Sequence, residues 1–173
     1  MNIHTIILAA GAGSRMKSNQ AKVLQRIGGM SMLQRVLQTI TKLNSKSTVV
    51  LGYDKEGVLQ HLQDIEGNIF TAIQANQLGT ADAVKSAMHN TKSNETILVL
   101  YGDVPLVSEK SLQELIDKSE NGFSILTTRL DDPFGYGRVI TDANNFATAI
   151  VEEKDASEDE KLVNEIFTGI LCI

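Results

Sequence analysis

The chain has 173 residues, 42% hydrophobic and 21% charged, which is typical of one globular domain with its own core. Its formal net charge of −5 argues against a nucleic-acid partner, because the chain as a whole would repel a polyanion. No apolar run approaches the ~20 residues of a membrane span, so we expect no membrane partner. The lone cysteine, Cys172, fits a reducing, cytoplasmic location.

Positive charge is concentrated near the N-terminus. Residues 1–53 contain seven Lys and Arg residues and no Asp or Glu. Four of these cations lie close to a glycine turn: Arg15, Lys17, Lys22 and Arg26. Such a local excess in an otherwise acidic chain predicts an anion site.

Strand and helix patterns alternate through the first two thirds of the chain. Four apolar runs predict strands: Ile3–Ala9, Thr48–Leu51, Phe70–Gln74 and Ile97–Tyr101. Helical spacing predicts helices over Met32–Leu43, along Val58, Leu59, Leu62 and Ile65, over Thr80–His89 with Val84, Ala87 and Met88 inward, and along Leu112, Leu115 and Ile116. This alternation predicts the α/β class: a Rossmann-like, open, mostly parallel sheet with helices on both faces.

The pattern changes after Phe123. Four stretches look like strands joined by turns: Phe123–Leu130, Arg138–Thr141, Phe146–Glu152 and Glu165–Ile173. They predict a mixed or antiparallel extension of the sheet, and the acidic stretch Asp155–Lys161 predicts a solvated helix or loop.

The segment Leu8–Leu24 reads LAAGAGSRMKSNQAKVL and includes the end of the first apolar run. Glycine turns that follow a strand hold phosphate, because bare backbone N–H groups can approach the oxygens closely. The turn lacks the Gly-Lys-Ser/Thr ending of a Walker loop, and Met16 stands where a dinucleotide fingerprint has its third glycine. Arg15 and Lys22 supply the positive charge that a phosphate site needs.

Other polar residues fall at the ends of predicted strands, where an open parallel sheet binds its ligands. Asp103 in LYGDVPL could hold Mg²⁺ with phosphate oxygens, or could form an ordinary turn. Gln74 carries a donor and an acceptor that could match a pyrimidine edge, whereas Thr80 could be only a helix N-cap. Gly137 could contact a ligand or form a tight turn, and Glu152 could bind sugar hydroxyls or be an idle surface carboxylate.

Six segments occur in the order and approximate spacing of one enzyme family. They are LAAGAGSRM…KVL, QLGTADA, LYGDVPL, GYGRV, IVEEKDA and EIFTGI. The chain therefore resembles the N-acetylglucosamine-1-phosphate uridyltransferases and, more broadly, the sugar-phosphate nucleotidyltransferases. The first motif is common to many nucleotidyltransferases, but the combination is specific and covers nearly the whole chain.

The resemblance implies a fold of the nucleotide-diphospho-sugar transferase type. It also implies the reaction of UTP with N-acetylglucosamine 1-phosphate, a sugar 1-phosphate, to give UDP-N-acetylglucosamine and pyrophosphate with Mg²⁺ as cofactor. This chemistry suits a chain without an evident catalytic triad, because a phosphate monoester with a second pKa of about 6 is already ionised near neutral pH. Catalysis would then rest on aligning two anions and neutralising charge at the α-phosphorus.

The same resemblance assigns roles to residues. Arg15 and Lys22 are the expected catalytic residues, and Asp103 is the expected metal ligand. The expected nucleotide-binding residues are Leu8, Ala9, Ala10, Gly11, Ala12, Gly13, Gln74, Gly79, Thr80, Tyr101 and Gly102. The expected sugar-binding residues are Gly137, Glu152 and Thr168.

Two positions depart from the family pattern. Ala21 stands where the family has a proline, and Phe167 replaces the sugar-contacting asparagine of EINTGI. Because phenylalanine cannot hydrogen-bond a sugar, two alternatives stay open: a different nucleotide and sugar-phosphate pair, or a catalytically silent nucleotide-binding fragment.

We expect residues 1–173 to form one nucleotidyltransferase domain that is incomplete at its C-terminus. The chain stops in an apolar strand, Ile166–Ile173, whereas terminal residues of natural domains are usually polar and frayed. In the family, an acetyltransferase domain of β-helical repeats follows and builds a trimer, so we expect no such oligomer from this chain.

Overall fold

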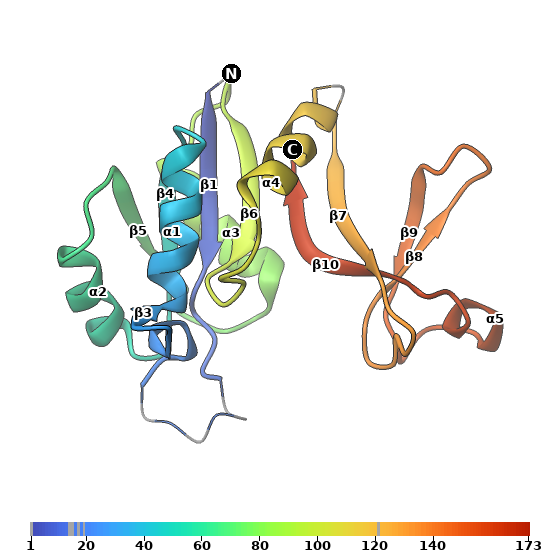
Figure 1. The fold of residues 1–173 in the computed structure, drawn as a ribbon, viewed down its shortest axis with the longest axis horizontal. Helices are drawn as coiled ribbons and strands as arrows, with labels where there is room; N and C mark the ends of the chain where they lie inside the picture. Colours follow the sequence, from blue (N-terminus) through green and yellow to red (C-terminus); the bar gives the residue numbers. More distant parts are fainter. Residues whose placement is uncertain (1, 14–15, 17, 19, 121) are drawn as a thin grey trace. The chain divides into compact units, whose positions relative to one another are not determined.

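The computed structural model describes residues 2–13, 16, 18, 20–120 and 122–173. The chain divides into two compact units, one formed by residues 1–124 with 171–173, and the other by residues 125–170. Figure 1 traces both along the sequence. None of the described helices is long and apolar enough to cross a membrane.

The first unit is built on a parallel sheet. Its strands are β1 (Ile3–Leu8), β4 (Lys46–Leu51), β5 (Ile69–Ile73) and β6 (Thr96–Tyr101), in the spatial order β5-β4-β1-β6. The end of β10 (Glu165–Cys172) adds an antiparallel neighbour to β6, with Leu171 opposite Val99 and Cys172 opposite Leu98. The predicted mostly parallel sheet is confirmed.

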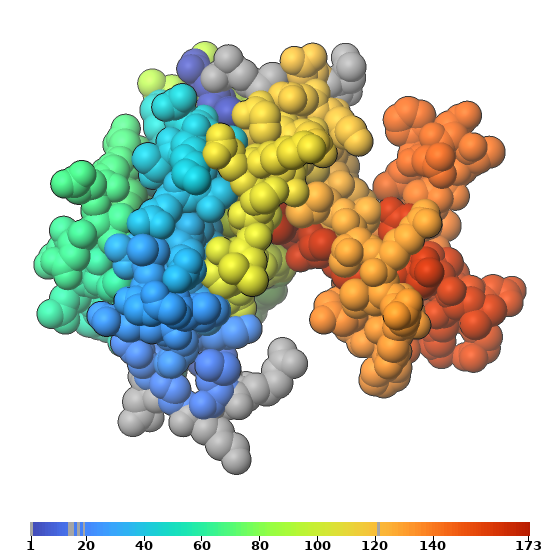
Figure 2. Space-filling view, in the orientation of Figure 1, coloured from blue at the N-terminus to red at the C-terminus, as the bar shows by residue number. Residues whose placement is uncertain are grey.

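Helices cover both faces of this sheet (Figure 1). Ala83 and Ala87 of α3 (Thr80–Ala87) pack on the face that carries Ile6, Leu8 and Val99. α1 (Met32–Lys42) and α4 (Glu109–Lys118) lie next to each other on the face seen in Figure 2. Their Leu, Val and Ile side chains are buried at helical spacing, as the sequence predicts.

Short capping contacts fix where two of these helices begin. Ser31 accepts a hydrogen bond from the Gln34 amide at 3.0 Å, and Ser108 accepts one from Ser111 at 3.0 Å. Between β1 and α1 lie a 3₁₀ turn at Lys22–Leu24 and a small hairpin of β2 (Arg26–Ile27) with β3 (Met30–Ser31).

Three residues predicted on the buried face of a helix are exposed or lie outside the helix: Leu59, Ile65 and Met88. α2 (Lys55–Gln63) ends before Ile65, and Leu59 is 37% exposed on it. Met88, the first residue of a 3₁₀ turn at Met88–Asn90, is 45% exposed, because the residues that α3 buries are Ala83 and Ala87.

The second unit is antiparallel. β8 (Arg138–Thr141) pairs with β9 (Ala147–Val151) in a hairpin, and β10 pairs with β8 and with β7 (Ser124–Arg129). A capping box between Ser157 and Glu160 starts the short α5 (Glu158–Lys161) within the acidic stretch. The predicted change to antiparallel strands after Phe123 is confirmed.

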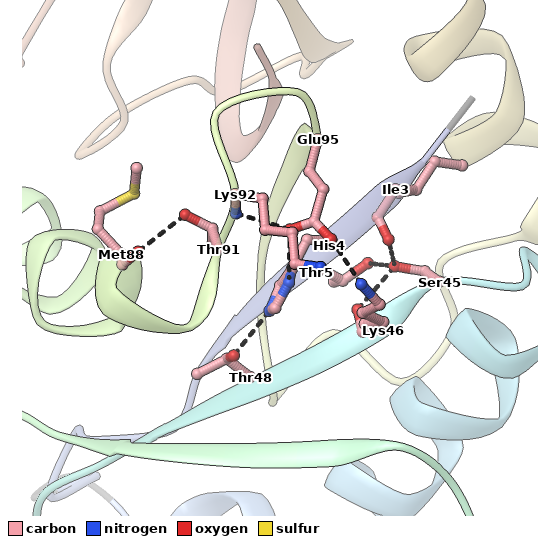
Figure 3. A network of polar contacts seen from close by, with 10 residues as sticks. All are labelled: Ile3, His4, Thr5, Ser45, Lys46, Thr48, Met88, Thr91, Lys92 and Glu95. Atoms are coloured by element: carbon pink, nitrogen blue, oxygen red, sulfur yellow. Dashed lines mark hydrogen bonds and ion pairs between the residues drawn. The ribbon is translucent and has the colours of Figure 1, made fainter.

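A buried polar network lies at the amino ends of the parallel strands (Figure 3). His4 is fully buried, and its ring nitrogens contact Glu95 at 3.2 Å and Thr48 at 2.7 Å. Lys46 Nζ donates to Glu95 at 2.7 Å and holds the pKa of that carboxyl at about 2, whereas burial lowers the pKa of His4. Because the polar groups of this network are hydrogen-bonded to one another, we expect a ligand site at the other, carboxyl end of the strands.

Candidate functional site

A cavity of about 340 Å³ opens at the carboxyl ends of β1 and β6. Eleven of its lining residues were predicted from the sequence as part of the site: Leu8, Ala9, Ala10, Gly11, Gly13, Lys22, Gln74, Gly79, Thr80, Tyr101 and Asp103. Val23, Gln77 and Ala83 also line it and were not predicted. Motifs separated by up to about ninety residues therefore meet at one edge of the sheet, where open parallel sheets bind ligands.

The glycine turn brings two segments into close contact. Gly13 has a φ of +58°, and a Cβ built on it would lie 2.8 Å from Cβ of Lys22. Only glycine fits this conformation and this contact without displacing the lysine. Arg15, the other predicted catalytic residue, lies outside the described residues, and Ala12 does not line the cavity.

Lys22 forms an ion pair with Asp103, at 2.6 Å between Nζ and Oδ2. Both side chains are partly exposed to the cavity. The pair places a cation that can meet phosphate beside a carboxylate that can meet a metal ion. Gly102, a predicted nucleotide-binding residue, does not line the cavity: it is buried, its N–H donates to the Leu8 carbonyl, and a Cβ on it would meet Val23 at 3.0 Å.

A hydrogen bond donated by the backbone ties the loop that carries Lys22 to Asp54, the residue at the start of α2. The Ala21 N–H donates to Asp54 Oδ2 at 3.0 Å. Proline, the residue that the resemblance leads one to expect there, has no N–H. The departure at Ala21 thus supplies an anchoring hydrogen bond that proline could not make.

Two glutamines from one loop reach the cavity. Gln74 is 7% exposed, and its Nε2 donates to the Gly79 carbonyl at 3.0 Å and to Asp82 Oδ2 at 2.9 Å. Gln77 Nε2 donates to the Ala10 carbonyl at 2.9 Å and so fastens this loop to the glycine turn. The role of Gln77 depends on a contact across 67 residues of sequence, which no local pattern reveals.

Gly79, at a φ of +111°, is the N-cap of α3, and Thr80 is its first residue. The interpretation of Thr80 as a mere N-cap is therefore wrong. Its hydroxyl instead lies 3.4 Å from that of Tyr101, across the cavity lining.

The three predicted sugar-binding residues belong to the second unit. A Cβ on Gly137 would lie 3.5 Å from Oε1 of Glu152, so these two residues are neighbours. Phe167 donates its N–H to the Gly137 carbonyl at 2.9 Å, and Thr168 donates its hydroxyl to the Leu126 carbonyl at 2.7 Å. The hydroxyl proton of Thr168 is therefore used within the protein, and its oxygen accepts from the Ile170 N–H at 3.4 Å, so only the second lone pair of that oxygen remains for a ligand.

A buried arginine holds the turn before Gly137. The Arg138 guanidinium donates to the Tyr136 carbonyl and pairs with Glu153 at 2.7 Å, and Glu153 also accepts from the Gly135 N–H. The hydrogen bond from Arg138 lowers the pKa of Glu153. Sequence reasoning noted Glu153 only as part of the segment IVEEKDA, because its partner was not apparent.

An open parallel sheet with a glycine turn and a lysine–aspartate pair at its carboxyl edge is an α/β domain with its candidate site where such sheets bind ligands. The model of the family described as MobA-like NTP transferase domain matches residues 5–150. The chain belongs to this family.

Longer proteins and solved structures resemble the chain. It is 41% identical over 171 residues to the "Bifunctional protein GlmU" of Dichelobacter nodosus, and 45% identical over 172 residues to that of Neisseria meningitidis serogroup B. These alignments cover 97% and 99% of this chain but 37% of each relative, so the chain spans little more than a third of their length.

Two solved structures share the fold. HddC from Yersinia pseudotuberculosis has a TM-score of 0.77 and 21% identity, with 99% of this chain and 76% of that chain covered. A UDP-glucose pyrophosphorylase complexed with UDP-glucose has a TM-score of 0.80 and 16% identity, with 100% and 76% covered. These likenesses confirm the predicted α/β fold.

Proposed function

We propose that the chain transfers a uridylyl group from UTP to N-acetylglucosamine 1-phosphate. The observation that carries the proposal is the single cavity that joins the glycine turn, the Lys22–Asp103 pair and the buried amide of Gln74. The ordered motifs of N-acetylglucosamine-1-phosphate uridyltransferases and the identity with proteins named GlmU support it. So does the UDP-glucose bound by a structure of the same fold.

In this reaction a phosphate oxygen of the sugar phosphate attacks the α-phosphorus of UTP. A new P–O bond forms, the bond to the β-phosphate oxygen breaks, and pyrophosphate leaves. The attacking phosphate is ionised near neutral pH, so no residue needs to remove a proton. The turn and Lys22 would bind and align the triphosphate, and Arg15 would neutralise charge in the transition state.

Asp103 is the residue that would hold Mg²⁺. Among the described parts of the chain, no three His, Cys, Asp or Glu side chains gather into a site that could hold an ion alone. One carboxylate on a phosphate-binding cavity fits the way Mg²⁺ binds with nucleotides, through one or two carboxylates, phosphate oxygens and water. When bound there, the ion would supply positive charge for the phosphate oxygens.

The roles of the second unit are part of the same proposal. Gly137, Glu152 and Thr168 would bind the amino sugar, with the Glu152 carboxylate accepting from hydroxyls. A cytoplasmic location is supported by the free, buried Cys172. The partners would be UTP and the sugar phosphate alone.

The test is pyrophosphate release from UTP, N-acetylglucosamine 1-phosphate and Mg²⁺, with glucose 1-phosphate as the control sugar. Release that depends on the acetylated sugar is expected. Turnover with another nucleotide or sugar phosphate, but not with this pair, would reassign the substrates. An unchanged rate in Arg15→Ala would remove that residue from the catalytic role.

The second candidate is a nucleotide-binding module without turnover. It is favoured by Phe167, whose backbone bonds Gly137 in the proposed sugar site while its side chain has no hydrogen-bonding group. This candidate predicts UTP binding without pyrophosphate release. Equilibrium binding of UTP, measured beside the turnover assay, separates the two candidates.

A further inference from the structure

Asp82 holds the amide of Gln74 in one orientation. Gln74 Nε2 donates to the Gly79 carbonyl at 3.0 Å and to Asp82 Oδ2 at 2.9 Å. A carbonyl and a carboxylate only accept, so the nitrogen of the amide must face both of them. The alternative orientation would set the Gln74 oxygen against two other acceptors.

This orientation leaves the oxygen of Gln74 for the ligand. Both protons of its nitrogen are used within the protein, and the residue lines the cavity. Its Oε1 makes no hydrogen bond to the described residues and is not among their buried, unpartnered atoms. The group that Gln74 offers to the cavity is therefore an acceptor.

We infer that Asp82 is a positioning residue that sets base specificity by fixing Gln74 as a hydrogen-bond acceptor. Uracil and thymine carry a donor, N–H, at ring position 3, whereas cytosine carries an acceptor there. An acceptor at this position accepts a hydrogen bond from uracil or thymine. Against cytosine it faces the lone pair of a second acceptor. The inference rests on the proposed function, because it assumes that Gln74 meets the base of the nucleotide at ring position 3 rather than at position 4, where cytosine carries an amino group.

Asp82 also lies in the first turn of α3, where any carboxylate stabilises a helix. That role is structural and does not depend on which nucleotide is bound. Glu56 occupies the equivalent first turn of α2 with a side chain 78% exposed, away from the cavity lining. Glu56→Gln therefore reproduces the helix effect without touching Gln74.

The experiment compares UTP with CTP in the wild-type chain, Asp82→Asn, Asp82→Ala and Glu56→Gln. Equilibrium dissociation constants are measured without the sugar phosphate, and kcat and KM are measured with it. At position 82 an amide can present either a donor or an acceptor, so only the Gly79 carbonyl still opposes rotation of the Gln74 amide by 180°. We expect Asp82→Asn to reduce the preference for UTP over CTP by about tenfold, mainly in binding and KM.

Glu56→Gln should keep the wild-type preference, and the thermal midpoint of each variant shows the helix effect separately. An unchanged UTP/CTP ratio in both Asp82 variants would overturn the inference, even if their stability falls. If the wild type binds UTP without turnover, the proposed reaction fails, but the ratio of dissociation constants still decides the role of Asp82. If it binds neither nucleotide, both proposals are wrong.

Discussion

At the scale of single residues, the Lys22–Asp103 pair is the most informative feature of the site. Its 2.6 Å contact joins partly exposed side chains, and such pairs add at most about 1 kcal/mol to folding. The pair contributes little to stability but lines the candidate cavity, which fits the proposed roles of Lys22 in phosphate binding and of Asp103 in metal binding. Each member can then be removed with little effect on the fold.

We expect Lys22→Met to lower kcat by about 10²–10³-fold, because a cation aimed at the developing charge is lost. Its thermal midpoint should stay near that of the wild type. Pyrophosphate release and thermal unfolding measure the two effects. Lys55→Met is the matched control, since it removes an exposed lysine paired with Glu56 at 3.5 Å. Equal loss of activity in both variants would contradict a specific role for Lys22.

Asp103→Asn should change the metal dependence of the reaction. Replacing the carboxylate by an amide keeps the shape and removes the charge that a hard cation prefers. We expect the Mg²⁺ concentration for half-maximal rate to rise by about tenfold or more, and chelation of the metal to abolish turnover of the wild type. Asp117→Asn, in an exposed pair with Gln113, is the control. An unaltered Mg²⁺ titration would exclude Asp103 as a ligand.

At the scale of elements, the turn at Gly13 sets the position of Lys22. An alanine there would adopt a φ of +58°, at a cost of roughly 1–2 kcal/mol, and would press its Cβ to within 2.8 Å of Cβ of Lys22. We expect Gly13→Ala to reduce kcat/KM for UTP by at least about tenfold, since displacement of a positioned group by 1 Å can cost more.

Gly29→Ala is the control for that variant. Gly29 also has a positive φ, +83°, but a Cβ on it would meet nothing within 4 Å. It therefore reports the backbone strain alone. Comparable losses of activity in the two variants would show that the contact between residues 13 and 22 is not what the reaction needs.

The elements themselves could largely be predicted from the sequence, because apolar periodicity reports which side of a strand or helix is buried. The β2–β3 hairpin escaped prediction, since two-residue strands are too short for any period, although Gly28 and Gly29 are a turn signal. Met88 was wrongly predicted to face inward: it lies four residues after Val84, but the residues that α3 buries are Ala83 and Ala87.

The candidate site could be predicted in part, and the limit is physical. Glycine turns and residues at strand ends are local signals, so Gly13, Lys22, Gln74 and Asp103 were found. Gln77, which bonds Ala10, and Arg138, which pairs with Glu153, act through partners that only the folded chain brings near. A polar side chain with a distant partner looks, in sequence, like any surface residue.

At the scale of the whole molecule, the candidate cavity and a buried polar network lie at opposite ends of the same parallel strands. The cavity lies at the carboxyl ends, whereas His4, Lys46 and Glu95 form a network at the amino ends (Figure 3). Both ends carry ionisable groups, but only the network is closed from solvent at its centre. The pH dependence of folding of the first unit should therefore come largely from the network, whereas the lowered pKa of Glu153 acts in the second unit.

The direction of that dependence follows from two pKa values. Glu95 has its pKa held at about 2 by the hydrogen bond from Lys46, against 4.5 ordinarily, and burial keeps the pKa of His4 below 6.5. In both cases the unfolded chain binds a proton more readily than the folded one. Stability is therefore greatest near neutral pH and falls on acidification, first below about pH 6.5 through His4 and then below about 4.5 through Glu95.

We expect the thermal midpoint to fall by about 5 °C or more between pH 7 and pH 3.5. Glu95→Gln should reduce the dependence of the thermal midpoint on pH below about pH 4.5. His4→Gln should reduce it between about pH 6.5 and about pH 4.5. The exposed Glu66→Gln should leave the curve unchanged. Since the network has no part in the cavity, UTP binding at pH 7 should survive in every variant that remains folded. A curve that keeps its full slope in both network variants would locate the titrating groups elsewhere.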